Sequence, residues 1–252
     1  MPLLASWVWL LLALVPLIFL ERWIHRHLQG VWLLIFRDPD IALVMYSITM
    51  LPGVLLHEGS HWIAATLLGV RTGRFSVIPE RMPDETLRLG YVETAKVDFL
   101  RQALIGIAPL VAGAGAIIFM GDGRLGVGPV GEAVMRGDVL AMVEGIRAMM
   151  AAPDFWLWLY AIFTVSNSML PSASDRRAWL PSAILVALLG GLLVYAGFGL
   201  VLAQTLAAPL DAATRALAAA FTLTIGLNLF IAPFIWLIER ALMRVTGLKV
   251  DY

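Results

Sequence analysis

The sequence contains no cysteine, which excludes disulfide bonds and thiolate metal ligands. Any bound metal ion must therefore be held by His, Asp or Glu side chains. Charged residues are also scarce, at 14% of the 252 residues, whereas an ordinary soluble domain has about a quarter. The 18 basic and 18 acidic residues cancel, so no overall basic field favours nucleic acid as a partner.

Hydrophobic residues are abundant, at 60% of the chain, and they gather in long runs. Roughly 20 helical residues cross a hydrocarbon core of about 30 Å. We therefore expect an all-α membrane protein with about six transmembrane helices in the lipid bilayer, as one polytopic domain over residues 1–252. The expected spans are Leu3–Leu20, Ile41–Val70, Ala103–Met120, Phe155–Leu170, Leu180–Leu206 and Ala216–Leu237.

The segment between the second and third spans has a different pattern. Residues 75–78 and 87–97 alternate roughly between apolar and polar side chains around a turn that contains Pro and Asp. This alternation predicts a small β-hairpin, Arg74–Val97, at the membrane surface. The Gly-rich segment 121–154 carries apolar residues near helical spacing, which predicts a short surface helix.

Basic residues are distributed unequally between the two sides that alternating spans define. The side with both termini and residues 71–101 carries 11 of the 18 Lys and Arg residues, and the other side carries seven. An excess of Lys and Arg is typical of cytoplasmic segments. We therefore expect both termini in the cytoplasm, with the chain in the cell (inner) membrane.

Residues His57-Glu58-Gly59-Ser60-His61 form an HExxH motif. Histidines four residues apart lie one turn apart on one helix face, so both imidazoles can bind one ion. Glu58 then occupies the general-base position of zinc peptidases, within reach of a water molecule. An ionisable residue deep in a span costs about 2.5–3.5 kcal/mol, which favours a metal site over a chance polar cluster. The motif predicts His57 and His61 as zinc ligands.

A third ligand is expected, because a catalytic zinc ion commonly has three from the protein. His25 and His27 fall in a predicted loop on the opposite side of the membrane, too far away. Asp175 lies on the side of the motif and follows the polar stretch 166–174. Unwound backbone at membrane depth is tolerated only where protein or water satisfies it. The alternative is that Asp175 forms a surface ion pair with the two arginines that follow it.

These residues together resemble the site-2 protease family of intramembrane zinc metalloproteases. That family carries HExxH on an early membrane helix and an Asn/Pro-containing motif, ending in a ligand Asp, on a later one. Asn167, Pro171 and Asp175 resemble the second motif, and the similarity covers about residues 40–180. The chain departs from the family in having Arg176 where Gly usually follows the Asp, and in the spacing of Pro171 from Asn167.

The resemblance implies an intramembrane zinc metalloendopeptidase. The motif histidines and Asp175 would hold zinc, which lowers the pKa of a water molecule to about 7, and Glu58 would take the proton during attack on a peptide bond. Asn167 and Pro171 would support the site. The substrate would be an extended or unwound stretch of a membrane protein or peptide, because helical peptide bonds are protected by their own hydrogen bonds.

Two alternatives remain open at the level of sequence. The hairpin either captures substrate through an edge strand or is an ordinary surface hairpin. The whole chain could instead be a catalytically silent metal-binding membrane scaffold or transporter. The presence of Glu58 and the lack of an internal repeat favour the enzyme over this second class.

Overall fold

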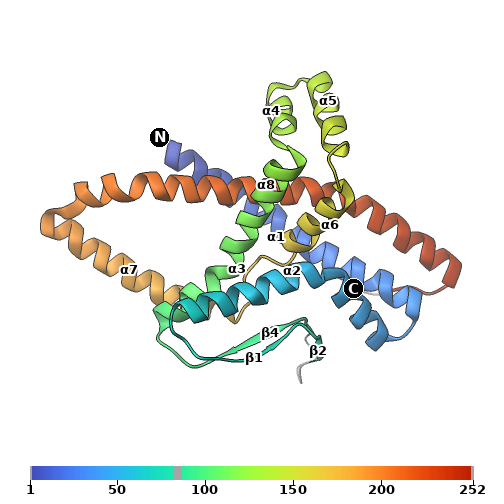
Figure 1. Cartoon of the computed structure of the whole chain (residues 1–252), viewed down its shortest axis with the longest axis horizontal. Helices are drawn as coiled ribbons and strands as arrows, with labels where there is room; N and C mark the ends of the chain where they lie inside the picture. Colours follow the sequence, from blue (N-terminus) through green and yellow to red (C-terminus); the bar gives the residue numbers. More distant parts are fainter. Residues whose placement is uncertain (1, 82–86, 251–252) are drawn as a thin grey trace.

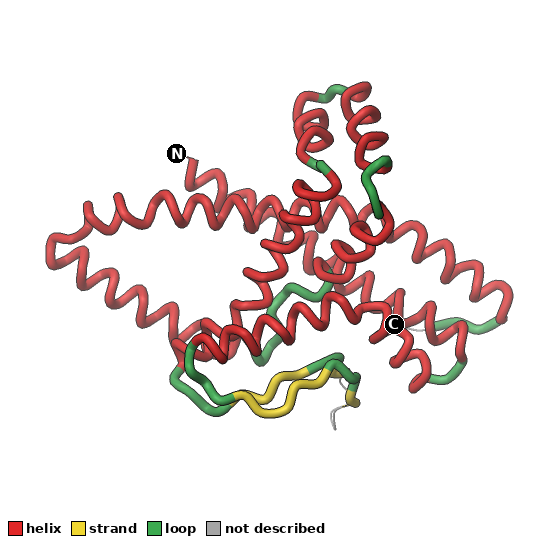
Figure 2. Tube along the Cα trace, viewed as in Figure 1, coloured by secondary structure: helices red, strands yellow, loops and turns green. Residues whose placement is uncertain are grey.

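The computed structural model describes residues 2–81 and 87–250, and the chain folds as helices joined by short loops (Figures 1 and 2). The helices are α1 (Pro2–Phe36), α2 (Pro39–Leu67), α3 (Phe99–Met120), α4 (Gly128–Arg136), α5 (Val139–Met150), α6 (Phe155–Ser166), α7 (Trp179–Leu193) and α8 (Gly199–Thr246). Shorter helical segments are η1 (Gly121–Leu125), η2 (Asp175–Ala178) and η3 (Val194–Phe198). The strands are β1 (Thr72–Ser76), β2 (Glu80–Arg81), β3 (Leu87–Arg88) and β4 (Tyr91–Thr94). The all-α prediction is confirmed.

Helices α2 and α3 begin at aspartate caps that their sequences provide. The Asp38 carboxylate accepts hydrogen bonds from the backbone N–H groups of Asp40 and Ile41, at 2.8 and 3.0 Å. The Asp98 carboxylate accepts one from the Arg101 N–H at 3.0 Å. Each cap satisfies donors that the first helical turn leaves without a partner. The two caps therefore set where the helices of the candidate site begin.

The two longest helices, α1 and α8, pack along each other (Figure 1). Polar side chains join them at three points, one of which is the hydrogen bond from Trp9 Nε1 to the Thr222 hydroxyl at 3.0 Å. The Ser6 hydroxyl donates to the Asp211 carboxylate at 3.1 Å, and His27 Nδ1 lies 2.6 Å from a Glu239 carboxylate oxygen. Trp23 stacks on the His27 ring, with centroids 4.0 Å apart. These polar groups of the two helices therefore have partners in the neighbouring helix.

Two segments that the sequence pattern predicted as loops are helical. Residues 21–36 of the expected loop 21–40 continue α1, and the expected loop 207–215 lies inside α8. Polar side chains four residues apart pair along each helix and so favour the helical state. The pairs are Glu21 with His25 and Asp211 with Arg215. The chain turns instead at Gly197, whose φ of 92° lies in the left-handed region that favours glycine.

Helices α2, α3 and α6 meet at the centre, where glycines allow close approach. A Cβ atom at Gly53 on α2 would lie 2.1 Å from the Thr164 carbonyl oxygen on α6. A Cβ atom at Gly113 on α3 would lie 2.5 Å from the Met169 Cβ in the segment after α6. Both separations are shorter than van der Waals contact. Only glycine therefore fits at these crossings.

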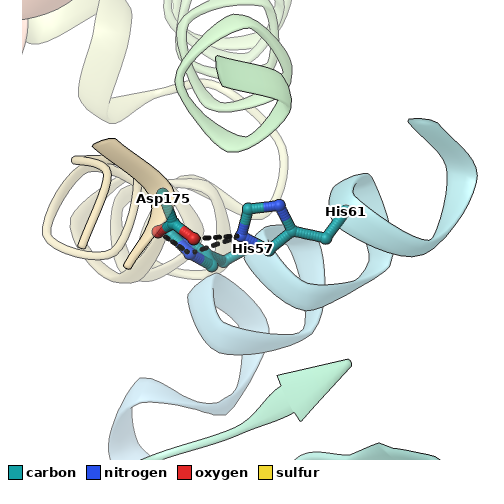
Figure 3. Close-up of side chains that lie close together, drawn as sticks. All are labelled: His57, His61 and Asp175. Carbon is teal, nitrogen blue, oxygen red and sulfur yellow. Dashed lines mark hydrogen bonds and ion pairs between the residues drawn. The ribbon is translucent and has the colours of Figure 1, made fainter. Parts of the chain in front are cut away.

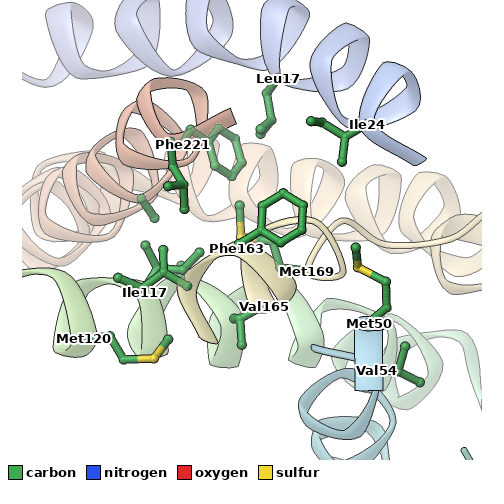
Figure 4. Packing of buried hydrophobic residues seen from close by; sticks show 14 of the residues in the cluster. Leu17, Ile24, Met50, Val54, Ile117, Met120, Phe163, Val165, Met169 and Phe221 are labelled. Carbon is green, nitrogen blue, oxygen red and sulfur yellow. The ribbon is translucent and has the colours of Figure 1, made fainter. Parts of the chain in front are cut away.

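The apolar core lies between α1, α2, α3, α6 and α8 (Figure 4). Met169 contributes to it from the irregular segment after α6 and is 2% exposed. This burial anchors the segment that leads to Asp175. Other members of the core are Leu17, Ile24, Met50, Val54, Ile117, Met120, Phe163, Val165 and Phe221.

The predicted hairpin is present as two short antiparallel pairs, β1 with β4 and β2 with β3. Phe75 lies opposite Val92 in the first pair, which packs against α2. Residues 82–86 of the predicted hairpin lie outside the described residues. In place of one surface helix, the segment 121–154 forms η1 and the helices α4 and α5, which project together from the centre (Figure 1).

Within the described residues, four helical stretches are long and apolar enough to cross a membrane, or five if the bent pair of α5 and α6 counts as one. The four are Leu4–Phe36, Pro39–Leu67, Phe99–Leu125 and Asp175–Thr246. The expected span Phe155–Leu170 is shorter than predicted, because α6 ends at Ser166 after 12 residues, about 18 Å. The expected spans Leu180–Leu206 and Ala216–Leu237 both fall within the stretch Asp175–Thr246. The count of six spans is therefore not confirmed.

Large apolar side chains are exposed along α7 and the first part of α8, which extend from the centre and meet near Gly197 (Figure 1). Leu188 is 67% exposed and Leu200 is 78% exposed. Contiguous apolar surface of this kind is unusual for a protein surrounded by water. The fold is therefore compatible with a membrane protein.

We predict that Gly53→Ala lowers the free energy of unfolding by roughly 1–3 kcal/mol, because the added Cβ would force α2 away from the α6 backbone. Thermal unfolding of the purified chain measures this change. The matched control is Gly59→Ala on the same helix, where a Cβ would meet no atom within 4 Å. The control should be neutral or stabilising by up to ~1 kcal/mol. Equal destabilisation by both variants would contradict the prediction.

Candidate metal centre

Helix α2 presents His57 and His61 on one face, one turn apart (Figure 3). Their rings meet edge to face, with centroids 4.9 Å apart and an interplanar angle of 80°. The two Nε2 atoms are 3.2 Å apart. Both side chains are largely buried, at 14% and 10% exposed. The HExxH spacing thus brings two imidazole nitrogens together in a protected site.

Each histidine ring donates a hydrogen bond to a backbone carbonyl of another segment. His57 Nδ1 lies 2.6 Å from the Ser168 carbonyl oxygen, and His61 Nδ1 lies 2.9 Å from the Ile105 carbonyl oxygen on α3. A carbonyl oxygen only accepts, so Nδ1 carries the proton in both rings. Nε2 of each neutral ring then presents its lone pair to the space between the rings. A ring whose other nitrogen is held by a backbone carbonyl is typical of metal-binding histidines.

Asp175 reaches the histidines because the segment 167–174 packs closely on α3. A Cβ atom at Gly106 would lie 2.2 Å from the Asp175 carbonyl oxygen. Gly106 is therefore required to be a glycine for Asp175 to approach so closely. Together with the contact of Gly113 with Met169, this gives α3 a glycine face along which the segment runs.

The Asp175 carboxylate points toward the two histidine rings (Figure 3). Oδ1 lies 3.4 Å from His61 Nε2, and Oδ2 lies 3.7 Å from His57 Nε2. The Ser172 backbone N–H and hydroxyl donate to Oδ2 at 2.7 and 2.6 Å. These hydrogen bonds hold the carboxylate in an orientation that exposes its oxygens to both rings.

The alternative pairing of Asp175 with the neighbouring arginines is not observed. In the described part of the chain, no ion pair joins Asp175 to Arg176 or Arg177. Arg176 Nε instead donates to the Ser172 carbonyl oxygen at 3.3 Å. The carboxylate is therefore available to the histidine side of the site.

His57, His61 and Asp175 form a group that could hold a metal ion, with one ligand atom from each within 4.8 Å of the others. Two ligands about 2.0–2.1 Å from a tetrahedral ion lie about 3.4 Å apart. The observed separations of 3.2, 3.4 and 3.7 Å are close to that value. Two imidazoles and a carboxylate suit zinc and also other divalent transition metals.

Glu58 lies next to this group on α2, where the hairpin packs against the helix. A Cβ atom at Gly90, just before β4, would lie 3.0 Å from the Glu58 Cγ, the Val54 Cγ1 and the Ser76 carbonyl oxygen. The side chain of the predicted general base is therefore in contact with the hairpin.

The two predicted supporting residues lie in the segment that joins α6 to Asp175. Asn167 is 1% exposed and exchanges two hydrogen bonds of 2.9 Å with the side-chain amide of Asn228 on α8. Pro171 is partly buried in the extended part of the segment. Its ring limits φ and favours extended backbone in the preceding residue, which keeps the segment from continuing as a helix.

Several residues at the site were missed by reasoning from the sequence. His25 was set aside as too distant, and it is not part of the metal group. Its ring nevertheless reaches the ligand-bearing segment, with Nε2 2.9 Å from the Asn167 carbonyl oxygen. Asn228 and Gly106 were also missed. A lone amide in an apolar run and a glycine inside a helix are the signals that would have identified them.

No protein-family model matches this chain, and no curated protein or solved structure matches it. The arrangement of the site is therefore the basis for a functional interpretation. The likeness to the site-2 protease family rests on the residues of the two motifs.

We predict that Gly106→Ala weakens zinc binding about tenfold or more, because the added Cβ would displace Asp175 from the histidines. The measurement is a zinc dissociation constant from competition with a chelating dye. Gly115→Ala on the same helix is the control, since a Cβ there would meet no atom within 4 Å. Zinc affinity should be unchanged in the control. Wild-type affinity in Gly106→Ala would show that this contact does not position Asp175.

Proposed function

We propose that the chain is a membrane-embedded zinc metalloendopeptidase of the kind found in the site-2 protease family. The observation that carries the proposal is the convergence of His57 Nε2, His61 Nε2 and the Asp175 carboxylate next to Glu58. Both histidines already have the tautomer that metal binding needs. A site with this donor set and an adjacent carboxylate is suited to hydrolysis of a polar bond.

The residues of the site divide the chemistry between binding and proton transfer. Zinc, when bound, would polarise the substrate carbonyl and lower the pKa of a water molecule to about 7. Glu58 accepts a proton from that water as its oxygen attacks the carbonyl carbon. The C–N bond then breaks, and Glu58 passes the proton to the leaving amine. Asp175 would offset part of the charge of a bound ion.

We propose that the substrate is an extended or unwound stretch of a membrane protein. Its peptide bonds must be free of helical hydrogen bonds to reach the site. Among the described residues, β1 and β4 pair only with each other, so an outer edge of this sheet is open to a further strand. Main-chain pairing along such an edge would hold an incoming chain next to Glu58.

We propose that the apolar stretches lie in the cell (inner) membrane, with both termini on the cytoplasmic side. The four apolar stretches and the exposed side chains of α7 and α8 support a bilayer location. Four crossings, with the bent pair of α5 and α6 left uncounted, return the chain to its starting side, as the six expected spans would. The larger number of basic residues on the side of the termini supports the orientation.

The experiment that tests the activity compares variants of Glu58 and Asp175 in purified protein. Glu58→Gln should bind zinc like the wild type but lose cleavage of single-span membrane substrates, by about 100-fold or more, because only the proton acceptor is removed. Asp175→Ala should lose zinc and cleavage together. Glu144→Gln on the exposed face of α5 should change neither.

Each outcome separates the enzyme from its alternatives. Wild-type turnover by Glu58→Gln would contradict the proposed mechanism. A wild-type chain that binds zinc but cleaves no substrate would favour the metal-binding scaffold or transporter. Unchanged zinc content in Asp175→Ala would remove Asp175 as a ligand while leaving the two histidines in place.

The orientation gives a separate prediction. A tag fused to either end of the chain should be digested by protease only after the cytoplasmic face is exposed, because both ends lie on that side. Sealed cells and inverted membrane vesicles provide the two faces. Digestion of a terminal tag from the outer face of intact cells would show that the orientation is wrong.

A further inference from the structure

A buried polar network links the outer helices to the segment that carries Asp175. Asn167, at the end of α6, exchanges two amide hydrogen bonds of 2.9 Å with Asn228 on α8. The backbone carbonyl of Asn167 lies 2.9 Å from His25 Nε2 on α1. The other nitrogen of His25 contacts the hydroxyl of Tyr46 on α2. Asn167, Asn228 and Tyr46 are 1%, 0% and 2% exposed.

The roles of donors and acceptors in this network are determined by the carbonyl group. Because the Asn167 carbonyl only accepts, the proton of His25 lies on Nε2. In a neutral ring Nδ1 must then accept, so the Tyr46 hydroxyl donates to it. The Asn167 side chain also donates to the Phe163 carbonyl oxygen at 2.8 Å, which fixes the amide orientation. Each polar group of the network is therefore paired.

Two consecutive backbone carbonyls in this segment each receive a histidine ring. The Asn167 carbonyl accepts from His25, and the Ser168 carbonyl accepts from His57. These two carbonyls belong to consecutive peptide groups that share the Ser168 Cα, so a displacement of the first group shifts the second. The hydrogen bond that orients His57 therefore depends on the position of Asn167. His25 and Asn228 hold Asn167, and both lie outside the segment 40–180.

We infer that His25 and Asn228 are positioning residues of the metal centre. They hold Asn167 in place, and the next peptide group, joined to it at the Ser168 Cα, carries the Ser168 carbonyl that accepts from His57 Nδ1. This inference rests on the proposed metal centre. It gives α1 and α8 a part in the site in addition to their part in the core.

The experiment measures zinc affinity and the visible spectrum of the cobalt(II)-substituted full-length protein. His25→Phe and Asn228→Ala should raise the zinc dissociation constant about tenfold, at the lower end of the effect of outer-shell changes. The cobalt spectrum should change as well, because the His57 ring would be less well oriented. Neither readout depends on catalytic activity.

Conservative and control variants separate positioning from simple stability. In His25→Gln the amide nitrogen can replace Nε2 as the donor to Asn167, so the dissociation constant should stay within about threefold of wild type. Thr224→Val removes a fully buried hydroxyl of α8 that donates only within its own helix, to Ala220, so zinc affinity should not change. Thermal unfolding monitors the stability of every variant.

The outcomes distinguish failure of the proposed metal centre from failure of the positioning role of His25 and Asn228. A wild-type chain that binds no zinc overturns the metal centre and this inference with it. If the wild type binds zinc and both His25→Phe and Asn228→Ala bind it equally well, the inference alone is overturned. Should His25→Phe fail to fold, the other two variants still test the inference. Weak zinc binding by His25→Gln, or normal zinc binding by Asn228→Ala, would contradict the positioning role.

Discussion

A buried backbone carbonyl needs a hydrogen-bond donor, and this requirement organises the centre of the molecule. The chain leaves helical structure after α6, so its carbonyl groups lose their helical partners inside the fold. Histidine rings supply donors to Asn167 and Ser168, and another ring does so for Ile105 on α3. The same hydrogen bonds that satisfy the backbone also orient the imidazoles. The same contacts therefore stabilise the irregular segment and determine the geometry of the site.

Much of the fold could be predicted because it follows from local patterns. The helical period, the alternation of the hairpin and the HExxH spacing each depend on residues near one another in the chain. Boundaries were harder to predict. Glu21, His25 and Asp211 indicated loops by their polarity, whereas the structure pairs them along and between helices. Such pairs depend on which helices pack together, which a single sequence does not specify.

The residues of the candidate site differ in how readily the sequence predicts them. His57 and His61 were apparent from spacing alone, while Asp175 required an argument about depth in the membrane and a resemblance to a family. The contribution of Gly106 depends on a contact between α3 and a segment about 70 residues away in the sequence. His25 was excluded by a predicted loop that proved to be helix. Long-range contacts of this kind leave no periodic trace in the sequence.

The carbonyl contacts of His57 and His61 have a consequence for how the proposed metal centre would form. In small zinc domains the ion orders its ligands, so removal of the metal unfolds the chain. Here the Ser168 and Ile105 carbonyls orient the two rings, and Ser172 orients Asp175, through hydrogen bonds made within the chain. The proposed metal centre would therefore take up its ion on a scaffold that the backbone has already shaped. For a chain of this kind, the supply of divalent ions would set the fraction of active molecules and not the fraction of folded ones.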